Sequence, residues 1–363
     1  MKKKILSLML AVVMMLSLSV TALAASVQTG VSADGTGTVT LTKSYTISGT
    51  APTETFYLVQ VGDVDISEDS SATVSASLNL DTDTTASIQV ESNEIVVSSV
   101  EIQSAVSTTT GTFTIGLPEY TKVGTYTYTL KEYVGSTAGV TYSSDTYYLI
   151  VYVMNVLDDD NLPTGGLTVT TDIRKSSVGG TKTDVIENEY KSGSLKITKT
   201  VTGAYGDTSS DNVFYFRVEF NTPNGKTWNG QNVMINGETV SLTAADNGQD
   251  YDYYYDFSLY SGQYITITNL PENVGYTVVE LTGNGGTEVA AGGSVGSYEV
   301  TYDTSVSGTI TSNATSDTTV TNEYDGEPDT GISLDSLPYI LMLIVVAAGV
   351  VVMISRRRLD NRF

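Results

Sequence analysis

The sequence predicts an all-β protein with two tandem immunoglobulin-like β-sandwich domains, and three observations support this fold class. Residues 26–324 are rich in Thr, Ser, Val and Tyr, with frequent Gly and Asn or Asp at the expected turns. No stretch of this region keeps the 3.6-residue period of an amphipathic helix. The length of 363 residues suits about two domains, each large enough to bury its own core.

The first expected domain spans residues 25–191. Its run Tyr147–Met154 is almost continuously apolar, which is typical of a strand buried on both faces. The other segments alternate between apolar and polar residues, as half-buried strands do. The candidate strands are 38–48, 55–61, 72–80, 112–115, 124–133, 146–155, 166–172 and 184–190.

The second expected domain spans residues 192–325 and repeats the same style. The clearest candidate strands are 213–220, 252–259, 263–269, 275–281 and 318–324. The segment Lys191-Ser192-Gly193 is the expected boundary. It is short enough to hold the two domains end to end.

Two lysines occupy positions where a buried apolar residue is expected. Alternate side chains of a strand share one face, so Lys199 lies in phase with Ile197 and Val201. Lys43 has the same phase within the strand 38–48. A buried, unpaired ammonium is costly, so each amine is expected to lose its proton or find a partner. A neutral amine is a nucleophile.

An inward acid and an inward amide follow each lysine in the same order. Glu132 and Glu280 lie in phase with apolar residues of their strands, and so do Asn188 and Asn322. The Lys-to-Glu separations are 89 and 81 residues, and the Glu-to-Asn separations are 56 and 42. Taken alone, an inward lysine usually extends its ammonium to solvent. A single inward Glu or Asn usually has its hydrogen bonds satisfied in a turn or bulge. The same order of inward Lys, Glu and Asn occurs in both expected domains, which argues against these ordinary explanations.

The neighbouring lysines Lys131 and Lys196 fall on the outward face, so they are the weaker candidates. Burial is expected to lower the pKa of the inward lysine and raise that of the inward glutamate. Each pair can then rest as a neutral amine and a neutral acid. The acid is expected to hydrogen-bond the side-chain carbonyl of the Asn and to shuttle a proton, so that ammonia can leave.

The N-terminus predicts export. Lys2-Lys3-Lys4 precedes an apolar run over residues 5–20, and Ala22-Leu23-Ala24 has the small residues of a cleavage site. This order is typical of a secretory signal peptide, which we assign to residues 1–24. The alternative is an N-terminal membrane anchor.

The C-terminus has three parts. Glu327-Pro328-Asp329-Thr330-Gly331 lies in a spacer over residues 326–336, an apolar segment follows over 337–355, and a basic tail covers 356–363. The apolar segment is long enough to cross a bilayer, and the arginines favour a cytoplasmic end. The order resembles the Gram-positive cell-wall sorting signal, in which a sortase cuts between Thr and Gly, here Thr330 and Gly331. Glu327 replaces the usual leucine, and a plain single-pass anchor is the alternative.

Composition excludes several function classes. Without the signal peptide and the tail, 11 basic and 39 acidic residues remain, a net of 28 negative charges that repels nucleic acid. The chain has no cysteine and no histidine, which excludes disulfides and Ser/His/Asp catalysis. We expect no cofactor and no metal, because the acidic clusters 63–65, 81–83 and 158–161 lack a full calcium-loop signature. Residues 251–256 could expose tyrosines to a carbohydrate, although a strand with buried rings is favoured.

The doubled Lys, Glu and Asn set and the sorting signal together resemble the backbone, or shaft, pilins of Gram-positive bacteria, whose domains close intramolecular isopeptide bonds. The resemblance implies one Lys-Asn bond in each domain, Lys43 to Asn188 and Lys199 to Asn322. It implies that Glu132 and Glu280 promote them. Such a reaction runs once per molecule, so the protein is not expected to be an enzyme.

The resemblance also implies a function and partners. The chain would be a structural subunit of a cell-surface pilus, polymerised when a sortase joins Thr330 to a lysine of the neighbouring subunit, and finally attached to peptidoglycan. The family's pilin-lysine motif is not recognisable here. Lys182 and then Lys175 are favoured as the acceptor because they precede the last strand of the first domain. The alternative is a wall-anchored adhesin that binds a host protein or glycan.

Overall fold

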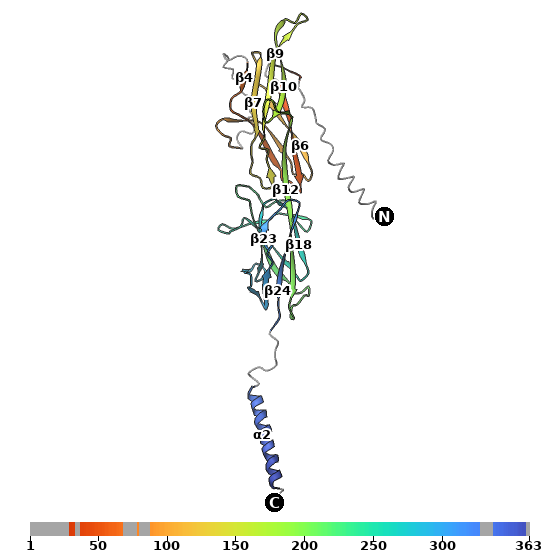
Figure 1. Ribbon diagram of the computed structural model, residues 1–363, viewed down its shortest axis with the longest axis vertical. Helices are drawn as coiled ribbons and strands as arrows, with labels where there is room; N and C mark the ends of the chain where they lie inside the picture. The colour runs from red at the N-terminus through yellow and green to blue at the C-terminus, as the bar shows by residue number, and fades with distance from the viewer. Residues whose placement is uncertain (1–28, 33–36, 68–77, 80–87, 327–336, 361–363) are drawn as a thin grey trace, which may run out of the picture.

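The computed structural model describes residues 29–32, 37–67, 78–79, 88–326 and 337–360. It confirms an all-β fold, with two β-sandwiches stacked end to end and one helix beyond the second (Figure 1). Two separate hydrophobic cores account for this division: one gathers residues between 39 and 190, the other residues between 195 and 320. The expected signal peptide lies outside the described residues. Residues 72–77 and 80 of the expected strand 72–80 also lie outside them.

The first domain packs two sheets against each other. One sheet has the order β1-β10-β9-β7-β3-β5, with β11 on β10 and β4 on β7; the other contains β2, β6, β8 and the first part of β12. The strands are β1 (Thr29–Ser32), β2 (Thr38–Ser48), β3 (Glu54–Val61), β4 (Asp65–Ser67), β5 (Glu94–Ile102), β6 (Thr109–Gly116), β7 (Gly124–Glu132), β8 (Val140–Thr141), β9 (Thr146–Leu157), β10 (Pro163–Lys175) and β11 (Thr181–Lys182).

The second domain is built in the same way. One sheet has the order β15-β14-β18-β12-β24-β22-β21, and the other has the order β16-β17-β13-β19-β20 with β23 on β19. The strands are β12 (Val185–Thr202), β13 (Phe214–Asn221), β14 (Val233–Ile235), β15 (Glu238–Val240), β16 (Thr243–Ala244), β17 (Tyr253–Leu259), β18 (Tyr264–Pro271), β19 (Gly275–Leu281), β20 (Glu288–Val289), β21 (Ser294–Val295), β22 (Tyr298–Tyr302), β23 (Ser307–Thr309) and β24 (Thr315–Glu323).

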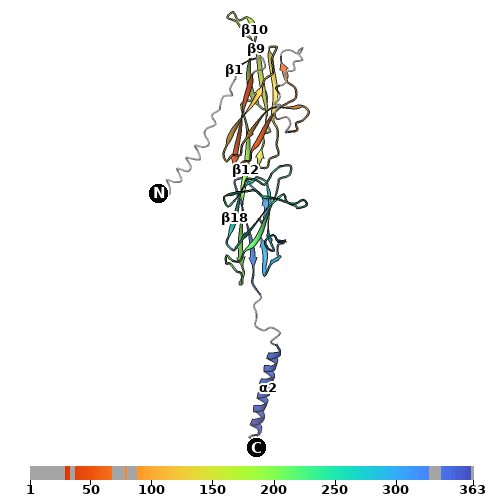
Figure 2. The ribbon, with the colours of Figure 1, turned by 180° about the vertical axis from the view of Figure 1, so that it is seen from behind.

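A single strand, β12, runs through both domains (Figures 1 and 2). The expected boundary Lys191-Ser192-Gly193 does lie between the two cores, but it is not a separate connection, because it falls in the middle of this 18-residue strand. Backbone pairing holds it there: β8 pairs at Glu189 and Tyr190, and β18 begins to pair at Ser192. The joint between the domains is therefore a hydrogen-bonded strand.

The inward face of β12 changes phase at the joint. Asn188 and Tyr190 are buried in the first half, Leu195 and Lys199 in the second, so the buried positions shift from even to odd numbers. Gly193 lies at this shift, where an added Cβ would sit 2.2 Å from the carbonyl oxygen of Thr311. A glycine is needed because the neighbouring backbone approaches so closely. The phase shift lets one strand supply an inward residue to each core.

The helix α2 (Leu337–Asp360) lies at the far end of the column from the β9–β10 hairpin (Figure 1). Its window Tyr339–Arg356 has a mean hydropathy of 2.4, which makes it long and apolar enough to cross a membrane. None of this window is buried against the rest of the described chain. Both domain cores close without the helix, so a fragment that ends after β24 keeps every described core contact.

Candidate crosslinking sites

The first domain brings its predicted Lys, Glu and Asn together. Lys43 on β2 is fully buried, and its Nζ donates to Oε1 of Glu132 at 2.7 Å. Asn188 on β12 donates from Nδ2 to the same oxygen at 3.0 Å. The backbone N–H of Ser143 donates to Glu132 Oε2 at 2.8 Å and to Asn188 Oδ1 at 3.0 Å. The carboxyl group thus bridges the amine and the amide.

The second domain repeats this arrangement. Lys199 on β12 is fully buried, and its Nζ donates to Asn322 Oδ1 at 2.5 Å and lies 3.8 Å from Glu280 Oε2. Asn322 on β24 donates from Nδ2 to Glu280 Oε1 at 2.7 Å. Glu280 and Asn322 are also fully buried. Lysine and amide touch directly here, with the acid beside both.

The same strand register produces both sites. In each domain the strand that carries the lysine pairs in parallel with the last strand, β2 with β12 and β12 with β24. Lys43 is opposite Ile186, two residues before Asn188, and Lys199 is opposite Val320, two residues before Asn322. Two residues along a strand return to the same face, so lysine and asparagine lie diagonally across adjacent strands.

Burial sets the electrostatics of both sites. It lowers the pKa of Lys43 and of Lys199 from 10.5 to about 8, while the neighbouring glutamate opposes this shift. Burial raises the pKa of Glu132 and of Glu280, against the opposing effect of the lysine. The directions agree with those expected from the sequence. A proton can therefore pass from amine to acid at a lower cost than in water.

Aromatic rings and one backbone group complete the sites, and the sequence reasoning missed them. Lys43 Nζ lies 4.4 Å from the ring centroid of Phe56, and Lys199 Nζ lies 4.4 Å from that of Phe214. These rings keep water away and face each amine at the distance of a cation–π contact. The N–H of Ser143 faces the Asn188 oxygen, where negative charge would develop. Only the alternating apolar pattern of the strands that carry Phe56 and Phe214 could have indicated the two rings.

The orientation of the amides differs from the expectation. In both sites the amide nitrogen faces the glutamate, whereas the sequence analysis expected the carbonyl oxygen there. A charged carboxylate only accepts hydrogen bonds, so it pairs with the N–H donors of the amide. In this geometry Glu132 and Glu280 face the nitrogen that would leave as ammonia. The carbonyl oxygen instead accepts from Ser143 N–H in the first site and from Lys199 in the second.

The lowered lysine pKa predicts a pH-dependent stability for a chain that cannot link. In an Asn322→Ala variant, Lys199 would keep a folded-state pKa of about 8 against an ordinary 10.5. Between these values the unfolded chain binds more protons, so stability should rise with pH. If the wild type is linked at this site, the difference in unfolding free energy between it and the variant should narrow by up to about 3 kcal/mol between pH 8 and 10.5. Urea unfolding of both proteins at the two pH values measures this difference. The buried tyrosines are common to both proteins, so their titration does not change it. A constant difference would show that Lys199 titrates normally.

The remaining sequence-predicted residues lie apart from these sites. Lys182 and Lys175 are on β11 and at the end of β10, with side chains 44% and 38% exposed. Lys131 is exposed and Lys196 is partly exposed, as expected. Thr330 and Gly331 lie outside the described residues.

The alternative ligand sites find no support in the described residues. No group of three or more acidic side chains there could hold a metal ion, and the cluster 81–83 lies outside them. Asp158 instead accepts from the backbone N–H groups of Asp160 and Leu162. The tyrosine-rich segment forms β17, whose Tyr253 and Phe257 are half-buried against the second core.

Comparison with known proteins assigns the two domains separately. Residues 39–191 match the family model described as "Spy0128-like isopeptide containing domain", and residues 193–324 match a domain of unknown function, DUF7601. A curated relative named "Pilin", from Streptococcus pyogenes serotype M1, is 26% identical over 256 residues, which cover 69% of this chain and 73% of the relative.

Two solved structures are also similar to this chain. A crystal structure of the major pilin from S. pyogenes has a TM-score of 0.44 at 20% identity, covering 80% of this chain and 99% of that chain. The structure of the major pilin from S. pyogenes serotype GAS13637 has a TM-score of 0.42 at 18% identity, covering 82% of this chain and 100% of that chain. By the family match and the curated relative, the chain is similar to a pilin over 69% of its length, and its first domain matches the Spy0128-like isopeptide-containing family model.

Proposed function

We propose that this chain is a pilin that forms the shaft of a covalently polymerised cell-surface pilus and stiffens itself with two intramolecular bonds, Lys43 to Asn188 and Lys199 to Asn322. The observation that supports this most strongly is the repeated register. Lysine and asparagine lie diagonally across paired parallel strands in both domains, with a buried glutamate against each pair. A chain that used these residues only for packing would have no reason to repeat a costly buried ionic cluster.

The proposed reaction begins with a proton transfer. Lys43 Nζ gives a proton to Glu132, which lies 2.7 Å away, and the neutral amine attacks the side-chain carbonyl carbon of Asn188. Negative charge on the oxygen is stabilised by the N–H of Ser143. Glu132 then gives this proton to the departing nitrogen and takes the second amine proton, so it ends as a neutral acid. The new bond joins Nζ to Cγ, the Cγ–Nδ2 bond breaks, and ammonia leaves.

The second site follows the same course with one geometric difference. Glu280 Oε1 lies 2.7 Å from the nitrogen that leaves, while its Oε2 is 3.8 Å from Lys199 Nζ and has no hydrogen-bond partner among the described residues. This free oxygen is placed to accept the lysine proton. Packing fixes the reacting groups side by side, which replaces a bimolecular encounter.

The bonds would close long loops. They span 145 residues in the first domain and 123 in the second. In the chain-entropy model, crosslinks over loops of this length stabilise a domain by about 4 to 5 kcal/mol. The chain has no cysteine, so these bonds would serve where an exported protein often uses disulfides.

Polymerisation would join Thr330 of one subunit to Lys182 of the next. A sortase would cleave between Thr330 and Gly331 while the apolar helix holds the precursor in the membrane, and the last subunit would be joined to peptidoglycan. Lys182 contacts Asp172 Oδ2 at 3.1 Å, and that carboxylate is itself buried. Lys175 is held by Asp145 at 2.6 Å and is the second candidate. The exposed Lys182 amine sits on a fixed support, which suits an acceptor.

A cell-wall extract tests polymerisation. Cells that express the chain with its cognate sortase should give an immunoblot ladder of high mass that resists boiling in detergent. Lys182→Arg should abolish the ladder, because arginine keeps the charge but cannot act as the acceptor amine. Thr330→Ala should also abolish it.

The matched control is Lys226→Arg, a lysine in the second domain, which should leave the ladder intact. If Lys182→Arg leaves the ladder and Lys175→Arg removes it, the acceptor assignment is wrong while the polymer stands. A single band from the wild type would count against polymerisation and favour an adhesin.

A further inference from the structure

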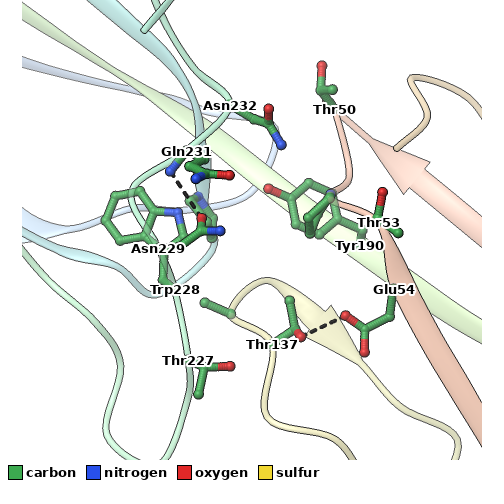
Figure 3. A pocket seen from close by; sticks show the side chains of 13 residues that line it. Thr50, Thr53, Glu54, Thr137, Tyr190, Thr227, Trp228, Asn229, Gln231 and Asn232 are labelled. Atoms are coloured by element: carbon green, nitrogen blue, oxygen red, sulfur yellow. Dashed lines mark hydrogen bonds between the residues drawn. The ribbon is translucent and has the colours of Figure 1, made fainter. Parts of the chain in front are cut away.

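A cavity of about 290 Å³ lies at the joint between the two domains (Figure 3). The first domain contributes one wall around Glu54, Thr137 and Tyr190, and the second contributes the facing wall around Trp228 and Gln231. The indole and the phenol lie on opposite sides of the cavity (Figure 3). The cavity shares no residue with the proposed crosslinks, although Tyr190 follows Asn188 by two residues on β12.

Contacts between the domains fix the cavity walls. Thr137 and Thr227 form a backbone bridge, with Ala138 N–H donating to Thr227 O at 2.9 Å. On the other side, the amide of Asn269 donates to the carbonyl oxygens of Thr50 and Asn232 at 3.0 and 2.6 Å. The two walls are therefore held at a set distance by hydrogen bonds from both sides.

Polar groups in this cavity have no partner within the described chain. The side chain of Tyr190 is only 2% exposed, yet its hydroxyl makes no hydrogen bond there and points into the cavity (Figure 3). Gln231 is exposed and Trp228 is half-buried, and neither side chain hydrogen-bonds to another described residue. Buried polar groups are normally satisfied, so an unpartnered hydroxyl directed at a cavity indicates a ligand or water site.

The charge of the lining favours a neutral ligand. Glu54 is the single charged side chain among the lining residues. Both of its oxygens are already occupied, by the hydroxyls of Tyr142 at 2.8 Å and of Thr137 at 2.7 Å. No lysine or arginine lines the cavity, so a phosphate or carboxylate would have no counter-charge there.

We infer that this cavity binds one neutral sugar ring, a hexose or N-acetylhexosamine, at the end of or within a glycan. A sugar offers apolar C–H faces to Trp228 and many hydroxyls to groups that both donate and accept, such as Gln231 and Tyr190. The volume is just below the range of about 300 to 1,000 Å³ typical of drug-sized ligands, which suits one ring. The inference goes beyond the proposed shaft function and does not depend on it.

The chain offers a direct probe, because Trp228 is its only tryptophan. We propose titrating the fragment 25–325 with the methyl glycosides of glucose, galactose, N-acetylglucosamine and N-acetylgalactosamine, while tryptophan fluorescence is recorded with selective excitation. At least one of them should give a saturable change. Gln231→Ala and the more conservative Tyr190→Phe should each weaken binding about tenfold, because each removes hydrogen bonds to the sugar.

Matched controls separate binding from general effects. Gln249→Ala, an exposed glutamine, and Tyr264→Phe, an exposed tyrosine, should leave the titration unchanged. Glucuronate and N-acetylneuraminate should not bind, because the cavity has no counter-charge. The inference is overturned if none of the four neutral sugars gives a saturable change, if Gln231→Ala binds like the wild type, or if the anionic sugars bind equally well. Crosslinking is read separately by intact mass, so failure of one idea leaves the other testable.

Discussion

The purified fragment 25–325 is expected to weigh two ammonia molecules less than its sequence predicts. Each domain holds one buried lysine amine beside an asparagine amide, bridged by Glu132 in the first domain and in direct contact in the second, and each new bond would expel one ammonia. Peptide digests should show Lys43 joined to Asn188 and Lys199 joined to Asn322 as branched peptides. Intact mass spectrometry under denaturing conditions measures the deficit, because a covalent bond survives unfolding.

Removing one glutamate should restore one ammonia. Glu280→Ala and the isosteric Glu280→Gln both remove the group that accepts the lysine proton, so the second domain should stay open while the first still closes. Glu219→Gln is the matched control, since Glu219 is also a buried glutamate of the second domain but touches neither lysine. A wild-type mass equal to the sequence mass, with Lys43 and Lys199 free in the digest, would refute the crosslinks.

Local patterns were enough to predict most strands. The candidate 38–48 has the same bounds as β2, and 275–281 has the same bounds as β19. Alternation and turn residues are properties of short segments, so they can be read without the rest of the chain. β12 was divided wrongly because a lysine, a serine and a glycine read as a linker, whereas pairing with β8 and β18 keeps them in a strand.

The sites were also predicted only in part, because their geometry depends on pairing between distant strands. The phase of Lys199 within its strand reveals that it points inward, and the repeated order reveals which Glu and Asn accompany it. The register that places Asn322 diagonally beside Lys199 comes from pairing between strands more than 100 residues apart. The contacts of Ser143 N–H and Phe214 depend on that packing as well. The cavity at the joint depends on how two domains meet, which no local pattern encodes.

The fold also indicates how load would pass through a shaft. If tension enters at Lys182 and leaves after β24, it runs down the continuous strand β12 as far as Lys199. There the proposed bond would pass it to Asn322 on β24, the strand paired in parallel with β12. The residues between Lys199 and Asn322 would then lie outside the load path. The domain could not be drawn out by pulling.

Single-molecule pulling should make this visible as a change in length. The chain has no cysteine, so Lys182→Cys and Asp325→Cys provide two unique attachment points on an otherwise unchanged fragment. The linked protein should give no unfolding step. With Glu280→Gln added, the 123 residues between Lys199 and Asn322 should be released in a step of about 400 Å.

The first crosslink supplies the control for this experiment, because all but the last few residues of its loop lie outside the tested path. Glu132→Gln should remove the bond between Lys43 and Asn188 yet add almost no length when force is applied from residue 182, since the freed segment precedes the attachment point except for residues 183–188. A step near 400 Å in the fully linked protein would mean that load does not pass through Lys199 and Asn322. Equal traces for Glu280→Gln and wild type would have the same meaning. A step only in Glu280→Gln would show that one continuous strand and one covalent bond carry the tension of the whole second domain.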